Sequence, residues 1–554
     1  MAARLREENL RGLLLGTGIA LFSVIAMGQE AGSAGARCRE LARVSLPHAK
    51  IEKADVTEAG KLAIEGVKEE LFARLPAFCR VIAESHPSSD SKIAIEAWLP
   101  MEGWNQRFLG VGNGGFAGEI DYRHLAVALL RGYATAGTDT GHKGNPADGA
   151  WALGHKEKIA DFGYRGVHEM TLSGEAIVKA FYGRAAGHRY FAACSDGGRE
   201  ALMEAQRFPN DYDGILAGAP AYNWTHLAYR FLTAVQALEN DPASYIPAAK
   251  LPAISKAVVA QCGTNGDADV LDDPRQCRFD PEKLKCDGAD TAECLTAPQV
   301  TALQALYAEA RLKDGTGVNP GWLPGGEMGH DGWAPWILGP APGKSLIWLF
   351  TTGYFTNMVY NQAGLDAHRL DPDEAFALSI RNTSKQLDAV DADLSQFRAR
   401  GGKLILFHGW DDPAIPAPAT IDYFDRVNKA AGDSASSFTR LFMIPGMQHC
   451  ADGPGATSFG QDGPSEIDGF DDAGHNLYHA LEIWTEQGTP PGEVIASRVE
   501  LQDGKPNVVF TRPLCAYPQR AVYSGTGDRS SAASWTCSAA KARLGRRHGS
   551  GNHG

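Results

Sequence analysis

The feature that most constrains the fold is an alternation of short apolar runs with longer amphipathic stretches, which the chain interrupts once. The alternation begins at about Lys92, stops after Gly218 to Asn223, and returns at Gly402 after about 170 residues. Alternation of this kind is typical of βαβ units and of a mostly parallel sheet. The sequence therefore predicts an α/β protein whose core is split by a long insertion.

The interruption also sets the predicted domain borders. Residues 33–222 and 396–540 are expected to form two parts of one core, and residues 223–395 a lid domain inserted between core strands. Local cysteine pairs, turns rich in proline and glycine, and many aromatic residues replace the alternation inside the lid. The basic, Gly/His-rich residues 541–554 are expected to be a disordered tail.

The N-terminus has the order of a signal peptide. Arginines precede an apolar stretch from Gly12 to about Gly28, and small residues follow from Ala31 to Ala36. A membrane anchor is the alternative, but an apolar stretch of about 17 residues interrupted by glycine is short for a span. We expect residues 1–32 to be removed, leaving a periplasmic or secreted protein with no membrane attachment.

The charge balance bears on possible partners. The chain has 53 basic and 66 acidic residues, a formal net charge of −13. A protein that binds nucleic acid needs a basic surplus to neutralise phosphates, so nucleic acid is not an expected partner.

A serine with small neighbours stands between a predicted strand and a predicted helix. The strand is His188 to Cys194, and Ser195 follows it with Ala193 two residues before and Gly197 two residues after. A nucleophile elbow needs small residues at these two places, because its turn is strained and closely packed. Ser195 is therefore the predicted nucleophile, with an ordinary strand-to-helix loop as the alternative.

A serine nucleophile needs a base and an acid, which in hydrolases of this topology follow in the order Ser, acid, His. Asp411 and Asp412 come just after an apolar run, and His449 lies in a loop past the next one. Asp412 is the predicted acid and Asp411 the alternative. His449 is the predicted base. His408 competes with it, but lies four residues before Asp412 on the strand side and is expected to bond structurally.

The ten cysteines divide by position. An even number in an exported chain favours disulfides. If Ser195 and His449 meet, their neighbours Cys194 and Cys450 also come close, and a bridge between them would join the two loops. The other expected pairs are neighbours in sequence: Cys38 with Cys79, Cys262 with Cys277, Cys286 with Cys294, and Cys515 with Cys537.

Four stretches together resemble the tannase and feruloyl esterase family, which includes bacterial mono(2-hydroxyethyl) terephthalate hydrolases. They are Cys194 to Glu200, Arg207 to Trp224, Gly401 to Asp412, and Arg440 to Cys450. The resemblance runs from about Cys38 to Cys537. It implies an α/β-hydrolase core with a large lid, a Ser-Asp-His triad linked by a disulfide, and esterase activity on aromatic acid esters.

The oxyanion hole is expected to combine two backbone N–H groups. One belongs to Asp196, the residue after the nucleophile. The other is expected from the glycine-rich run Val111 to Gly118, where Gly114 and Gly115 are equally possible donors. The chain departs from the family's common elbow at Ala193 and Asp196, and the acid at Asp196 is expected to alter the potential beside the oxyanion.

A structural calcium site is expected inside the lid. Oxygen ligands recur at alternate positions of an acidic loop, as in loops that wrap Ca²⁺, and the resembled family has a calcium in this loop. The expected ligands are Asn265, Asp267, Asp269 and Leu271. An acidic solvated turn is the alternative. A second metal pattern, His475 and His479, lacks the glutamate that a zinc peptidase uses as a base.

These observations predict an exported serine esterase that uses no organic cofactor. Its expected substrate is a small aromatic ester with a feruloyl, galloyl or terephthalate acyl group, such as a plant polyphenol or cell-wall ester. The alternatives are a non-catalytic binding protein on a hydrolase fold and a serine peptidase. The expected pocket walls are lid aromatics, namely Trp333, Trp336, Trp348, Phe350, Tyr354, Phe355 and Tyr360.

Overall fold

The computed structural model describes residues 34–263, 270–461 and 471–539. The expected signal peptide, 1–32, and the expected disordered tail, 541–554, lie outside these residues. Within the described ranges, no helix has both the length and the apolar character that a bilayer crossing requires.

One nine-stranded sheet organises the core, in the order β1-β2-β3-β5-β4-β6-β7-β10-β11. The first four strands of this order pair antiparallel, and the pairs from β5 to β11 are parallel. The bounds are Ala49–Thr57 (β1), Phe78–Ser85 (β2), Ile93–Pro100 (β3), Arg107–Val111 (β4), Ala134–Thr138 (β5), His188–Cys194 (β6), Gly214–Gly218 (β7), Lys403–Gly409 (β10) and Thr439–Ile444 (β11).

Helices cover both faces of the sheet, because each has one apolar face to bury. Apolar residues of α4 (Gly166–Tyr182), α5 (Asp196–Arg207) and α12 (Pro418–Ala431) share a buried cluster with one sheet face. Residues of α2 (Tyr122–Leu130) and α13 (Leu477–Gln487) join clusters that also contain sheet residues. The short helix α3 (Lys156–Ala160) precedes α4. This is the expected α/β-hydrolase architecture.

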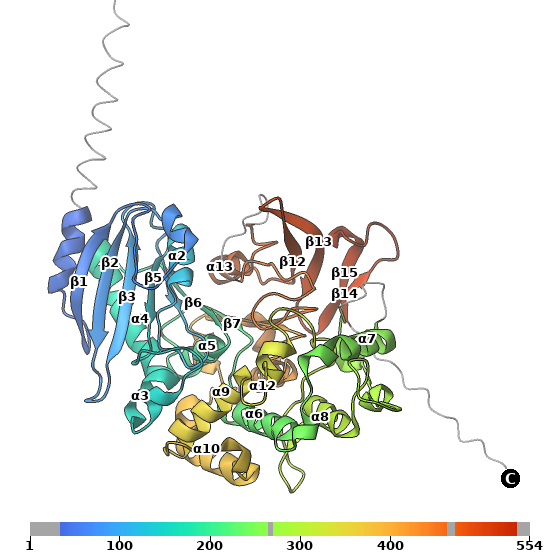
Figure 1. Ribbon diagram of the computed structural model, residues 1–554. Coiled ribbons are helices and arrows are strands. Elements are labelled where there is room, and N and C mark those ends of the chain that lie inside the picture. The colour runs from blue at the N-terminus through green and yellow to red at the C-terminus, as the bar shows by residue number, and fades with distance from the viewer. Residues whose placement is uncertain (1–33, 264–269, 462–470, 540–554) are drawn as a thin grey trace, which may run out of the picture.

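The chain leaves the sheet after β7 and returns to it as β10. The strand β10 lies beside β7 and pairs with it in parallel, with Lys403 opposite Gly214. The segment between them has its own buried cluster and appears in Figure 1 as the green to orange helices at the bottom of the molecule. Its elements are α6 (Trp224–Glu239), α7 (Leu251–Cys262), α8 (Ala297–Tyr307), β8 (Ala310–Arg311), β9 (Gly317–Asn319), α9 (Leu346–Gly353), α10 (Pro372–Leu387) and α11 (Ser395–Ala399).

Strands at both ends of the chain extend the fold beyond the expected alternation. β1 and β2 add an antiparallel edge to the sheet. After α13, two antiparallel pairs form, and a backbone bridge joins Phe442 of β11 to Ala516 after the first pair. Their strands are β12 (Glu493–Gln502), β13 (Lys505–Cys515), β14 (Gln519–Tyr523) and β15 (Trp535–Ala539).

Candidate active site

Ser195 occupies a strained turn between β6 and α5. Its backbone has φ 66° and ψ −124°, a conformation that an L-residue adopts only when its surroundings impose it. The turn is closely packed: a Cβ on Gly197 would lie 2.4 Å from the Cβ of Ala193, and one on Gly198 would lie 2.2 Å from the carbonyl oxygen of Gly218. Gly197 therefore leaves room for Ala193 and Gly198 for Gly218, and the turn has the geometry of a nucleophile elbow.

Ser195, His449 and Asp412 form a hydrogen-bonded chain. Oγ of Ser195 lies 2.8 Å from Nε2 of His449, and Nδ1 of His449 lies 2.8 Å from Oδ2 of Asp412. The three residues follow β6, β11 and β10, whose carboxyl ends meet at one edge of the parallel part of the sheet. The structure thus brings together the three residues that the sequence predicts as nucleophile, base and acid.

Asp412 is held from several sides. Its Oδ1 accepts hydrogen bonds from the backbone N–H groups of Ala414 and Ile415, at 2.8 and 2.9 Å. Its Oδ2 lies 3.1 Å from Nε2 of His408, which also lies 2.8 Å, through Nδ1, from the hydroxyl of Thr420. His408 is buried and shares Oδ2 of Asp412 with His449, and its structural role stays a prediction.

These contacts control ionisation. Burial opposes the charged form of Asp412, but the charge of His449 and hydrogen bonds from His408 and His449 lower the pKa of Asp412 below its usual value. Burial likewise opposes the charged form of His449, but Asp412 raises the pKa of His449 above 6.5. Asp412 is therefore ionised at neutral pH and stabilises a protonated His449.

Asp411, the alternative acid, is not the carboxylate that contacts Nδ1 of His449. It is 3% exposed, and its backbone lies against Gly326, where a Cβ would be 2.6 Å from the Asp411 carbonyl oxygen. Burial and the carboxylate of Glu327 raise the pKa of Asp411 to about 8. Two adjacent aspartates are therefore both buried and have opposite pKa shifts.

The expected oxyanion loop is fixed against α5. Gly197 N–H donates to the carbonyl of Asn113 at 2.8 Å, and Asn113 N–H donates to Oε2 of Glu200 at 2.9 Å. Gly115 lines both cavities that meet at Ser195, whereas Gly114 lines only the larger one. This position favours Gly115 as the second donor, next to the N–H of Asp196. The oxyanion role of Asp196, Gly114 and Gly115 stays a prediction.

The carboxylate of Asp196 is held by a buried arginine. It is 1% exposed and binds the guanidinium of Arg199, at 2.5 Å to Nε and 3.0 Å to Nη2. Arg199 in turn donates to the carbonyl of Gly163 and lies 4.8 Å from the ring of Phe162. The acid that was expected to alter the oxyanion potential is therefore paired with a buried cation. Burial and Asp196 raise the pKa of the neighbouring Glu200 to about 8.

Two cavities meet at Ser195. One, of about 510 Å³, is mostly apolar, and one, of about 1220 Å³, also borders His449 and polar groups. The first is lined by Gly115, Ser195, Asp196, Ala221, Trp224, Leu227, Ala228, Phe231, Trp336, Phe350, Tyr354, Ala414 and Ile415. The second has the polar or titratable residues Asn113, Asp121, His124, Asn145, Ser195, His449, Gln461 and Tyr478 on its walls.

The lid aromatics divide between cavity and core. Trp336, Phe350 and Tyr354 line the apolar cavity, and the ring of Trp336 also contacts that of His449 edge-on at 5.0 Å. Trp333 and Phe355 are buried in the lid core, Trp348 stacks on His368, and Tyr360 packs against the lid core. Sequence reasoning missed the α6 wall, Trp224, Leu227 and Phe231, whose spacing of three to four residues along one helix is the signal that could have found it.

All five expected disulfides are present, and the described residues include no free cysteine. The bridge between Cys194 and Cys450 spans 256 residues with a Cα–Cα distance of 5.9 Å. It joins the residue before Ser195 to the residue after His449.

The structure describes only part of the expected calcium loop, but it describes both members of the histidine pair, His475 and His479. Asn265, Asp267 and Asp269 lie outside the described residues, and the side chain of Leu271 is buried in the lid core. His475 bonds Asp472 at 2.9 Å, and His479 bonds Glu482 at 2.7 Å. The two histidines are therefore held by separate carboxylates.

Comparison with known proteins identifies relatives along nearly the whole chain. The family model for tannase and feruloyl esterase matches residues 79–538. An uncharacterized esterase from Xanthomonas campestris pv. campestris is 40% identical over 562 residues, 96% of each chain. Feruloyl esterase B from Aspergillus niger is 32% identical over 467 residues, 83% of this chain and 86% of the relative.

A solved structure agrees with these relatives. The crystal structure of feruloyl esterase B from Aspergillus oryzae matches with a TM-score of 0.82 at 27% identity, covering 91% of this chain and 100% of that chain. The α/β-hydrolase prediction is thereby confirmed. The chain belongs to the tannase and feruloyl esterase family and is a carboxylic ester hydrolase.

Proposed function

We propose that the protein is an exported serine esterase that hydrolyses esters of aromatic carboxylic acids through an acyl-enzyme. The observation that carries this proposal is the unbroken chain of 2.8 Å contacts from Ser195 through His449 to Asp412. A non-catalytic binding protein would not need these groups aligned, and no observation favours a peptidase.

The reaction proceeds in two steps. Nε2 of His449 takes the proton of Ser195 as Oγ attacks the ester carbonyl, and Asp412 stabilises the imidazolium. The N–H groups of Asp196 and of Gly115 or Gly114 bind the oxyanion. His449 then gives its proton to the leaving alcohol, and a water molecule, deprotonated by His449, releases the acid and restores Ser195.

The two cavities suit the two halves of an ester. A flat aromatic acyl group fits the apolar cavity, whose walls are rings and aliphatic side chains. The alcohol then lies on the side of the larger cavity, which also borders His449. This assignment places the leaving oxygen next to the base that must protonate it.

The apolar cavity also favours one acyl class. Its described lining includes no lysine or arginine, Asp196 is paired with Arg199, and the Tyr354 hydroxyl is 2.6 Å from that of Thr383. A carboxylate or several hydroxyls buried there would lose water without gaining partners. The methoxylated ring of a ferulate therefore fits better than a gallate or a terephthalate monoester.

A substrate panel tests this choice. We expect kcat/KM for methyl ferulate to exceed that for methyl gallate by roughly 10- to 100-fold. The difference should be larger for mono(2-hydroxyethyl) terephthalate, because its second carboxylate is charged. p-Nitrophenyl acetate, which has no acyl ring, serves as the control for intact chemistry. Preference for the terephthalate ester would contradict the assignment of the apolar cavity, and hydrolysis of the acetate alone would contradict an aromatic substrate.

Export is proposed because of the five disulfides, which persist in oxidising compartments. The expected cleavage site follows residue 32, outside the described residues. N-terminal sequencing of the mature protein checks this, and an intact Met1 in the functional protein would contradict it.

The lid calcium also stays a proposal. The disulfide between Cys262 and Cys277 closes the loop that contains the expected ligands, and Asp273 beside them is already paired with Arg275 at 2.8 Å. A chelator is expected to lower the melting temperature, and Ca²⁺ but not Mg²⁺ should restore it, because Mg²⁺ demands a smaller octahedral site. No change on chelation would remove the proposal.

A further inference from the structure

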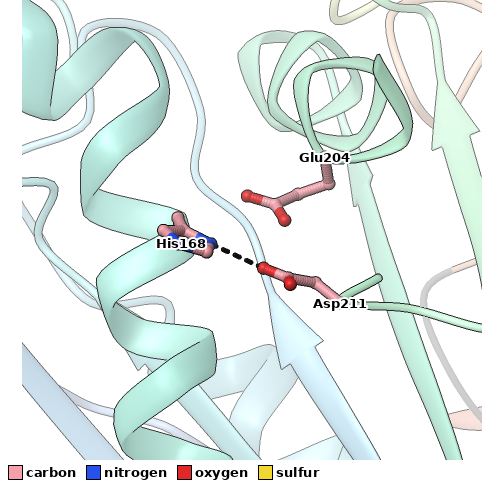
Figure 2. Close-up of side chains that lie close together, drawn as sticks. All are labelled: His168, Glu204 and Asp211. Carbon is pink, nitrogen blue, oxygen red and sulfur yellow. Dashed lines mark hydrogen bonds and ion pairs between the residues drawn. The ribbon is translucent and has the colours of Figure 1, made fainter. Parts of the chain in front are cut away.

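Three potential metal ligands meet on the core side of the molecule, apart from Ser195. His168 lies on α4, Glu204 on α5, and Asp211 in the segment between α5 and β7. One ligand atom from each lies within 4.8 Å of the other two. Figure 2 shows Glu204 extending from α5 toward the pair that His168 and Asp211 form.

Glu204 is the member that needs an explanation. It is 1% exposed, and neither of its carboxylate oxygens receives a hydrogen bond from the described residues. Burial and the Asp211 carboxylate raise its pKa well above the usual value. A buried carboxylate with no donor is strongly unfavourable unless a proton or a cation compensates it.

The neighbouring arginines do not supply that cation. Arg189 binds Glu175 at 2.9 Å and Asp213 at 3.2 Å, and Arg199 binds Asp196. Glu200, one turn before Glu204 on α5, adds a further buried acid. Glu204 also lies in the last turn of α5, where the helix dipole favours a positive charge.

The other two ligands are ordered and accessible. Nδ1 of His168 lies 2.6 Å from Oδ2 of Asp211, and the imidazole stacks on the ring of Phe208 at 3.7 Å and 8°. Their side chains are 23% and 10% exposed. His168 is therefore the most exposed of the three ligands, and Glu204 is the most buried.

We propose that His168, Glu204 and Asp211 bind a first-row divalent cation such as Zn²⁺. One imidazole nitrogen and two carboxylate oxygens are a ligand set that zinc accepts, with water as a fourth ligand. Ca²⁺ would need six to eight oxygens, which three side chains do not provide. The ion would tie α4, α5 and the segment before β7 together, about 13 Å along α5 from Ser195, and so would stabilise the helix behind the elbow without touching substrate.

The proton balance follows from the ligands. His168 would bind through Nδ1, so the proton that this nitrogen directs at Oδ2 of Asp211 would move to Nε2, and both oxygens of Asp211 would be left to accept from the ion or from water. Glu204 is buried with no donor to either oxygen among the described residues, so the ion would replace the proton that otherwise compensates its charge. Binding of one Zn²⁺ therefore releases about one proton to the buffer at neutral pH.

The experiment is a Zn²⁺ titration of the full mature protein after chelation and return of Ca²⁺. Calorimetry in two buffers of different ionisation enthalpy is expected to give one ion per chain with release of about one proton. Zn²⁺ should also raise the melting temperature. Glu204→Gln should weaken Zn²⁺ binding by at least about tenfold. Removal of a group that only orients a metal ligand already causes a loss of this size. The variant should also abolish proton release.

Two further variants keep the test decisive. His168→Gln changes a partly exposed ligand and should weaken Zn²⁺ binding even if Glu204→Gln does not fold. His475→Gln alters the separate histidine pair on the surface and should leave this binding intact. The alternative is that Glu204 only shares a proton with Asp211. No stoichiometric binding, or binding unchanged by Glu204→Gln or His168→Gln, would overturn the site.

Discussion

Replacement of Ser195 by alanine is expected to lower kcat for ester hydrolysis by about 10⁴- to 10⁶-fold while KM changes little. The substitution removes only Oγ, which lies 2.8 Å from Nε2 of His449, and leaves both cavities and the backbone donors of the oxyanion hole. Substrate should therefore still bind, and the residual rate should reflect water attack aided by those donors. Steady-state kinetics with methyl ferulate measure the effect.

The matched control is Ser437→Ala. Ser437 is exposed and precedes β11, at the opposite end of that strand from His449. Its hydroxyl donates a hydrogen bond to the carbonyl of Ser434, so kcat should not change. A serine-directed phosphonate should label the control and the unmodified protein but not Ser195→Ala. Hydrolysis by Ser195→Ala within about tenfold of the unmodified protein would refute the serine mechanism.

The arrangement of the candidate site was predictable because each part has a local signal. Small residues around Ser195 specify the turn, and apolar runs before Asp412 and His449 specify strands. Parallel strands deliver residues at their carboxyl ends to one edge, so the order along the chain was enough to propose contacts across more than 200 residues, such as that between Ser195 and His449.

The edge strands were not predictable in the same way. β1 and β12 each bury few of their residues, and several of the others are charged. Charged side chains protect an exposed strand edge from pairing with other molecules, but they also hide the apolar alternation that identifies a strand. Contacts between residues far apart in sequence, such as the bridge from Phe442 to Ala516, have no local signature.

Buried charge was the other part that the sequence concealed. Asp196, Glu200, Glu204 and Asp411 look like ordinary surface acids in the sequence, yet each is 3% exposed or less. Three of them lie on α5 at intervals of four residues, about one turn, so the helix behind the elbow carries an acidic buried face. Arg199 neutralises Asp196, and the proposed cation would neutralise Glu204. The partner of a buried acid depends on which elements pack against its helix. The packing of the whole core decides this, and no local stretch of sequence shows it.

The second large effect is expected from the double variant Cys194→Ser with Cys450→Ser. The bridge closes 256 residues, and loop-closure entropy predicts a loss of about 5.5 kcal/mol in the free energy of unfolding. Equilibrium unfolding in urea measures this loss. Because the bridge also joins the neighbours of Ser195 and His449, we expect kcat for methyl ferulate to fall as well.

The control double variant, Cys286→Ser with Cys294→Ser, comes from the same molecule. That bridge has a sequence separation of 8 and a Cα–Cα distance of 5.0 Å, and the same relation predicts a loss of only about 2.5 kcal/mol. It lies in the lid between α7 and α8, so kcat should be retained. Because both variants replace two cysteines by two serines, their difference isolates loop length and location. Equal destabilisation would show that unfolded-state entropy does not govern these bridges, and unchanged kcat in the first variant would show that packing of β6 and β11 alone aligns the serine and the histidine.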